Sequence, residues 1–164
     1  MQLSRAPLLV LGVGNPSRGD DALGPLFIER AAEAWRERVA AGQIELLTDF
    51  QLQIEHALDL EGRSRVIFVD ASVEAAPPFH YAPVAAGPAP LPSTHAMSPG
   101  QVLAAYRQLR GEPPEAWLLA IRGEQFELGA ALSGQAAANL DAALRFLLDA
   151  VQPTPPEDQL TSAP

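Results

Sequence analysis

Three side chains suited to metal binding or proton transfer stand at places that a parallel sheet would bring to one edge. Asp21 follows an apolar run and a glycine-containing turn, Asp70 ends a second apolar run, and His95 precedes a helix expected to start at Ser98. Two carboxylates and one imidazole suit a divalent metal, and three protein ligands leave positions open for water or substrate. Aspartates at strand ends are also common turn and cap residues, so the residue types alone leave a structural role open for each.

The first glycine-containing turn also resembles the start of a dinucleotide-binding fingerprint. Gly12 and Gly14 follow an apolar run, but Ser17 stands where the third glycine should be. Asp49, which comes after the next apolar run, would then take the place of the acid that binds the ribose. Against this alternative, Pro16 adds rigidity to the turn, and the two aspartates that follow put negative charge where a pyrophosphate would lie.

A serine hydrolase is a further alternative. Ser17 or Ser93 would be the nucleophile, with His95 and Asp70 as its partners. The sequence contains no G-x-S-x-G segment that would expose a serine at a sharp turn, and it contains no HExxH zinc motif. The hydrolase reading is therefore the weakest of the three.

The elements that must position these residues follow from apolar periodicity and from the places of Gly and Pro. Strands are predicted over residues 8–12, 44–47, 65–70 and 117–121, with an edge strand over 79–84. Helices are predicted over 21–38, 98–110 and 133–151, and a short helix is predicted after a cap at Thr48 or Asp49, ending at Gly62. Such alternation predicts an α/β fold, a three-layer α/β/α sandwich whose mostly parallel, twisted, five-stranded sheet carries helices on both faces. His56 and His80, on the short helix and in a Pro-rich stretch, are assigned no chemical role.

Composition narrows the class of protein. The 164 residues include 11 basic residues, all arginine, and 20 acidic ones, for a net charge of −9, which argues against a nucleic-acid surface. The absence of cysteine excludes a disulfide, a thiolate nucleophile and a Cys-based metal site. No apolar run approaches the ~20 residues of a membrane span, and no secretory signal is recognisable. We expect a cytoplasmic protein with one domain over residues 1–151 and a Pro-rich, disordered tail over 152–164.

Four segments in order closely resemble the [NiFe]-hydrogenase maturation proteases. They are LVLGVGNPSRGDDALG, VIFVDAS, STHAMSPGQVLAAY and LLAIRGEQFELG. The resemblance extends over most of the chain, from about Leu8 to Val151, and its motifs are specific in combination. It implies a cytoplasmic endopeptidase that removes a C-terminal extension from the hydrogenase large-subunit precursor after nickel insertion.

The resemblance also implies a site and a metal. In the family a metal-binding triad consists of an acidic residue after the GxGN turn, an aspartate at the end of the third strand and a later histidine. By motif these positions are Asp21, Asp70 and His95, which are then both the catalytic and the metal-binding residues. The metal is nickel supplied by the precursor, although another divalent ion is an alternative in the isolated protein. A monomer is expected, and a non-catalytic nickel-binding accessory protein stays open as an alternative function.

Two features depart from the family pattern. Many relatives carry Glu where this chain has Asp21, whose shorter side chain reaches less far. The segment TDFQLQIEHALDL replaces the Gly-Gly-Thr type of motif that many members have after the second strand. This segment resembles the branch that serves soluble, NAD-reducing hydrogenases. Arg18 is a candidate for holding a substrate carboxylate, with a solvated surface position as the favoured alternative, and Glu124 is expected near the rim of the site but not as a ligand.

Overall fold

A five-stranded sheet organises the protein, whose computed structural model describes residues 5–88 and 96–152. The strand order is β2-β1-β3-β5-β4. The strands are β1 (Leu8–Val13), β2 (Ile44–Asp49), β3 (Arg65–Ser72), β4 (Phe79–Pro83) and β5 (Glu115–Arg122). All pairings are parallel except that of β4, which runs antiparallel to β5 at one edge. The predicted mostly parallel sheet and its edge strand are confirmed.

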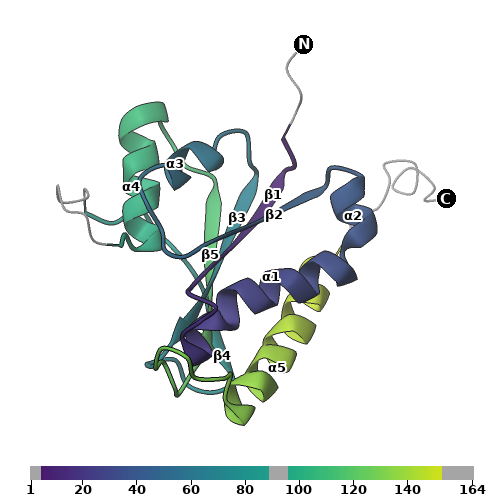
Figure 1. The fold of residues 1–164 in the computed structure, drawn as a ribbon. Helices are drawn as coiled ribbons and strands as arrows, with labels where there is room; N and C mark the ends of the chain where they lie inside the picture. The colour runs from purple at the N-terminus through teal and green to yellow at the C-terminus, as the bar shows by residue number, and fades with distance from the viewer. Residues whose placement is uncertain (1–4, 89–95, 153–164) are drawn as a thin grey trace.

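Helices cover both faces of this sheet, as Figure 1 shows. The helices are α1 (Leu23–Ala34), α2 (Arg36–Ala40), α3 (His56–Asp59), α4 (Pro99–Arg110) and α5 (Gly134–Ala150), and a 3₁₀ turn, η1 (Gly19–Ala22), precedes α1. One core cluster joins the sheet to α1 and α5, and a second joins the opposite face to α3 and α4. Every residue of β1 is buried, as expected of a parallel strand covered on both sides. The three-layer prediction is therefore confirmed.

Two predicted helices differ from the observed ones. The helix expected over 21–38 begins later, at Leu23, and is interrupted at Trp35, whose backbone leaves the helical region (φ −103°, ψ 20°). The helical spacing of apolar residues extends through the buried Trp35. No residue of α2 is buried, so no core packing holds the chain beyond Trp35 on the axis of α1. The short helix expected between a cap at Thr48 or Asp49 and Gly62 is only the single turn α3, since β2 continues to Asp49 and the N–H of Gln53 donates to the His56 ring.

The helices on either side of β5 begin and end at the predicted signals. Ser98 caps α4 in a capping box with Gln101, and Gly111 follows its last residue with φ 111°. Ser133 caps α5 through the N–H of Ala136. Among the described residues, no helix is long and apolar enough to cross a membrane. His95, Ser93 and almost all of the expected tail lie outside the described residues.

Candidate functional site at the carboxyl edge of the sheet

Asp70 lies in the last part of β3, on the face of the sheet that α4 covers. Side chains alternate along a strand, and the preceding residues Val66 and Phe68 on this face belong to the core cluster that includes α4. Asp70 is opposite Ala120 of β5 in the register. The Asp70 carboxylate is partly buried, and its Oδ1 accepts the N–H of Ala71 at 2.8 Å. The strand thus carries a carboxyl group from the core onto the carboxyl edge of the sheet.

Asp21 is presented at the same edge by η1. Its Oδ2 accepts the N–H of Asn15 at 2.7 Å, which fixes the carboxylate against the turn after β1. That turn needs Gly14, because φ is 147° there and a Cβ would lie 1.9 Å from the carbonyl oxygen of Asp21. A close backbone approach at Gly14 therefore sets the position of Asp21.

Asp21 is near enough to Asp70 to affect the ionisation of Asp70. The pKa of Asp70 is raised to about 7: burial raises it most, the Ala71 hydrogen bond lowers it in part, and the negative charge of Asp21 raises it further. At neutral pH the pair therefore shares less negative charge than two free carboxylates would. A divalent cation between them would replace the Asp70 proton, so the donor set fits such an ion.

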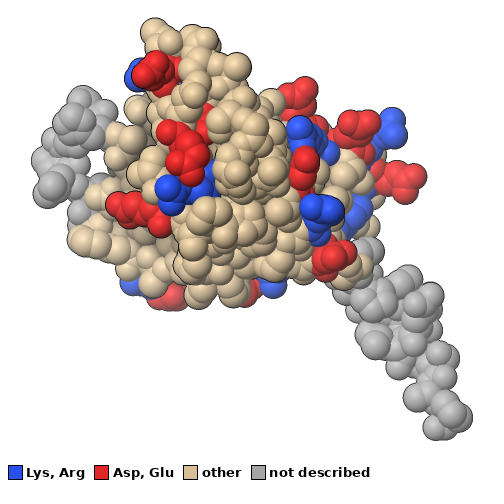
Figure 2. Space-filling model, turned by 90° about the horizontal axis from the view of Figure 1, so that it is seen from below, with Lys and Arg blue, Asp and Glu red and all other residues tan. Residues whose placement is uncertain are grey.

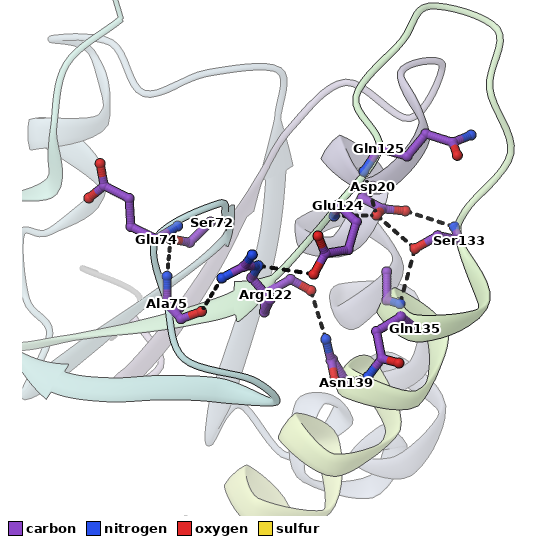
Figure 3. A network of polar contacts seen from close by, with 11 residues as sticks. Asp20, Ser72, Glu74, Ala75, Arg122, Glu124, Gln125, Ser133, Gln135 and Asn139 are labelled. Atoms are coloured by element: carbon purple, nitrogen blue, oxygen red, sulfur yellow. Dashed lines mark hydrogen bonds and ion pairs between the residues drawn. The ribbon is translucent and has the colours of Figure 1, made fainter.

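The neighbouring Asp20 has a different task, which the sequence did not indicate. Its side chain is fully buried and accepts hydrogen bonds from the N–H groups of Glu124, Gln125 and Ser133 and from the Ser133 hydroxyl, at 2.7 to 2.9 Å (Figure 3). Burial alone would raise the pKa of Asp20, but the four hydrogen bonds outweigh it and the pKa is lowered. Asp20 thus ties η1 to the connection between β5 and α5.

Backbone hydrogen bonds reinforce this tie. The N–H groups of Gly19 and Asp20 donate to the carbonyls of Ala130 and Gln125, and the N–H of Gly129 donates to the carbonyl of Ser17. The segment that carries Asp21 is therefore held by a second loop as well as by β1. Figure 2 looks toward this edge of the molecule from below and shows acidic and basic side chains interspersed on it.

The predicted triad is placed in part. Asp21 and Asp70 come together, whereas His95 lies outside the described residues. Within 5–88 and 96–152 no group of three His, Cys, Asp or Glu side chains could hold a metal ion. The chain re-enters the described structure just after His95, and the N–H of Met97 donates to the carbonyl of Leu52 at 3.1 Å. Met97 packs on the same core cluster as Phe68, so the chain meets the Asp70 face there.

Asp49 and the two described histidines, His56 and His80, are the remaining candidates from the sequence. The Nε2 of His56 lies 3.2 Å from Asp49 Oδ2, and its Nδ1 accepts the N–H of Gln53 at 2.9 Å. Asp49 also accepts the N–H of Phe50. His80 is exposed on β4. Among the described residues, neither histidine belongs to a group of three side chains that could hold a metal ion.

The alternative functions find little support in this geometry. In the dinucleotide reading the glycine turn should open a helix at once, but η1 separates Gly14 from α1. Ser17 is an exposed turn residue whose N–H donates to Asn15 Oδ1, and its hydroxyl has no hydrogen bond to another described residue. Neither the dinucleotide-binding module nor the serine hydrolase is favoured.

Comparisons of sequence alone identify no relative: no family model matches the chain, and no curated protein does. Comparison of the fold does. The hydrogenase maturating endopeptidase HybD from E. coli matches with a TM-score of 0.64 and 26% identity over 87% of this chain and 90% of that one.

Two archaeal structures match over a similar length. The [NiFe] hydrogenase maturation protease HycI from Thermococcus kodakarensis KOD1 has a TM-score of 0.64 at 20% identity, covering 89% of this chain and 91% of its own. The hydrogenase 2 maturation peptidase from Thaumarchaeota archaeon SCGC_AB-539-E09 has a TM-score of 0.57 at 20% identity, covering 87% and 96%. The fold of this chain is that of the hydrogenase maturation proteases, which confirms the resemblance carried by its sequence motifs.

Proposed function

We propose that this protein is an endopeptidase that removes the C-terminal extension of a [NiFe]-hydrogenase large-subunit precursor. The observation that carries the proposal is the closeness of Asp21 to a partly buried Asp70 at the carboxyl edge of the sheet, in a fold shared with hydrogenase maturation proteases. The precursor is the partner of the protein. We propose that it is the large subunit of a soluble, NAD-reducing hydrogenase, because the segment after β2 resembles that branch of the family.

In this proposal the nickel belongs to the substrate. The precursor brings the ion to the carboxyl edge, and Asp21, Asp70 and His95 complete its coordination. Bound there, nickel would polarise the scissile carbonyl and lower the pKa of an attacking water. His95 binds as the neutral imidazole.

The two carboxyl groups contribute differently. Asp21 is fixed by the Asn15 N–H, which donates to its Oδ2. Asp70, whose pKa is raised to about 7, can carry a proton near neutral pH and lose it when a cation approaches. A group with such a pKa can also take a proton from the attacking water and return it to the leaving amine.

The decisive experiment incubates the protein with nickel-loaded and nickel-free precursor and measures the mass of the large subunit. We expect loss of the C-terminal extension from the nickel-loaded precursor only. Asp21→Asn, Asp70→Asn and His95→Ala should abolish the cut, whereas Asp149→Asn, which changes an exposed residue near the end of α5, should not.

Each alternative predicts a different result. A nickel-binding accessory protein would bind the ion in calorimetry and leave the precursor at full length. A dinucleotide-binding module would bind NAD and cut neither precursor. Cleavage that continues at the normal rate in His95→Ala would remove that residue from the proposed triad.

A further inference from the structure

Arg122, the last residue of β5, ends its strand at the edge of the sheet that carries the carboxylate pair. Its register partner is Ser72, two positions after Asp70 on β3, so Arg122 and Asp70 belong to the same face of the sheet. Because a strand rises about 3.3 Å per residue, the Arg122 backbone lies about 7 Å further along the strand direction than that of Asp70. The Arg122 backbone is fixed on both sides, because its N–H donates to the carbonyl of Pro78 and its carbonyl accepts Asn139 Nδ2.

The Arg122 side chain is only partly engaged by the protein. Nη1 donates to the carbonyl of Ala75 at 3.1 Å (Figure 3). Nε lies 3.2 Å from Glu124 Oε1, but the direction is unsuited to a hydrogen bond, and Nε is the only buried side-chain nitrogen or oxygen in 5–88 and 96–152 that lacks a partner. Buried donors of this kind usually mark a missing partner.

The surrounding charge favours an anion as that partner. A guanidinium presents a planar fork of donors that a carboxylate matches with two parallel hydrogen bonds. Glu124 does not fill the fork in this way, and its side chain is 46% exposed, whereas that of Arg122 is 26% exposed. Glu124 is therefore a nearby carboxylate that an incoming one can displace.

We propose that Arg122 binds a carboxylate of the precursor's C-terminal extension, displacing the Glu124 side chain, and so positions the scissile bond over Asp21 and Asp70. The inference rests on the proposed function and adds a substrate requirement to it. An extended chain covers about 7 Å in two residues, so the carboxylate belongs a few residues beyond the scissile bond. It is either an acidic side chain of the extension or the terminal carboxylate of a short one.

The test measures kcat and KM for cleavage of nickel-loaded precursor by the wild type, Arg122→Gln, Glu124→Gln and, as a matched control, Arg110→Gln. Arg110 is an exposed arginine at the end of α4 that pairs with Glu61. We expect Arg122→Gln to raise KM about 10-fold or more with kcat changed little, since charged hydrogen bonds are worth that much. Glu124→Gln should lower KM, and Arg110→Gln should leave both constants unchanged.

Three precursors then identify the carboxylate: one unaltered, one with the acidic side chains of the extension changed to amides, and one lengthened by a Gly-Ser segment. If an alteration moves or removes the carboxylate that binds Arg122, the wild-type enzyme should have a raised KM for that precursor. For the same precursor, Arg122→Gln should raise KM no further. Equal effects of Arg122→Gln on all three precursors would overturn the proposal, as would a fall in kcat with KM unchanged.

The variants also separate this inference from the proposed function. If the wild type cuts none of the precursors, the proposed function fails. If the wild type cuts all of them and the KM values do not depend on the carboxylate, only the role of Arg122 fails. Because the Glu124 side chain is exposed and only its backbone N–H bonds Asp20, we expect Glu124→Gln to fold normally, so that its lowered KM tests the proposal even if Arg122→Gln is unstable.

Discussion

The Asp70 carboxyl group should make the protein less stable as the pH rises, and Asp70→Asn should remove this dependence. Asparagine keeps an oxygen that can accept the Ala71 N–H and has nearly the same shape, but it cannot ionise beside Asp21. The variant therefore isolates the cost of a buried negative charge near another one.

The sign and size follow from the two states. The pKa of Asp70 is raised by burial and by Asp21 to about 7, against 3.8 for the exposed group. Below pH 4 both states carry the proton and the wild type has no penalty. Between about pH 4 and 7 the unfolded chain has lost the proton and the folded one retains it, so the stability of the wild type falls relative to the variant. Above pH 7 the difference reaches a plateau of at most about 4 kcal/mol.

The assay is urea unfolding of wild type and Asp70→Asn at pH 4, 6 and 8 without metal. The difference in unfolding free energy between the two proteins cancels the carboxylates that both share. We expect the variant to gain stability relative to the wild type by several kcal/mol between pH 4 and 8, while the exposed Asp149→Asn shows no such trend. A difference that stays constant with pH would refute the account of Asp70 as a buried, charge-opposed carboxyl group.

Three further substitutions test how the site is held. Asp20→Ala leaves the N–H groups that it binds without a partner and should cost about 3 kcal/mol or more in urea unfolding, with loss of precursor cleavage. Gly14→Ala, whose Cβ would meet the Asp21 carbonyl, should destabilise far more than Gly42→Ala, which has a positive φ but open space around it and should cost about 1 kcal/mol. Ser98→Ala removes the α4 cap and should cost about 1 kcal/mol in the same assay.

Patterns with a strong local cause were predictable from the sequence. The run RVIFVD has the continuous apolar character of a strand buried on both faces, and it forms β3. The Ser98 and Ser133 caps lie directly before apolar helical periods, and both helices begin there. The break at Trp35 was not predictable, because Val39 keeps the helical spacing of apolar residues beyond Trp35. The helix ends there because the residues of α2 do not pack into the core.

The site was predictable to a lesser degree. Topology places Asp21 and Asp70 at the same edge, since both follow parallel strands. What distinguishes Asp20 from Asp21 is contact with Glu124, Gln125 and Ser133, more than a hundred positions along the chain, and no local pattern records such a contact. Likewise, the sequence alone does not show that Arg122 lies opposite Ser72, on the face of the sheet that carries Asp70.

Two adjacent aspartates thus perform opposite tasks because their surroundings differ. Asp20 is surrounded by donors, so its negative charge is compensated and it stabilises the fold. Asp21 faces Asp70, and the two charges repel each other whenever both are ionised. Left to itself, a loop would relieve that repulsion by moving apart. The segment that carries Asp21 is held at Gly14 by β1 and at Asp20 by the β5–α5 connection. The stability of these anchors therefore maintains two neighbouring carboxylates whose charge a cation can neutralise.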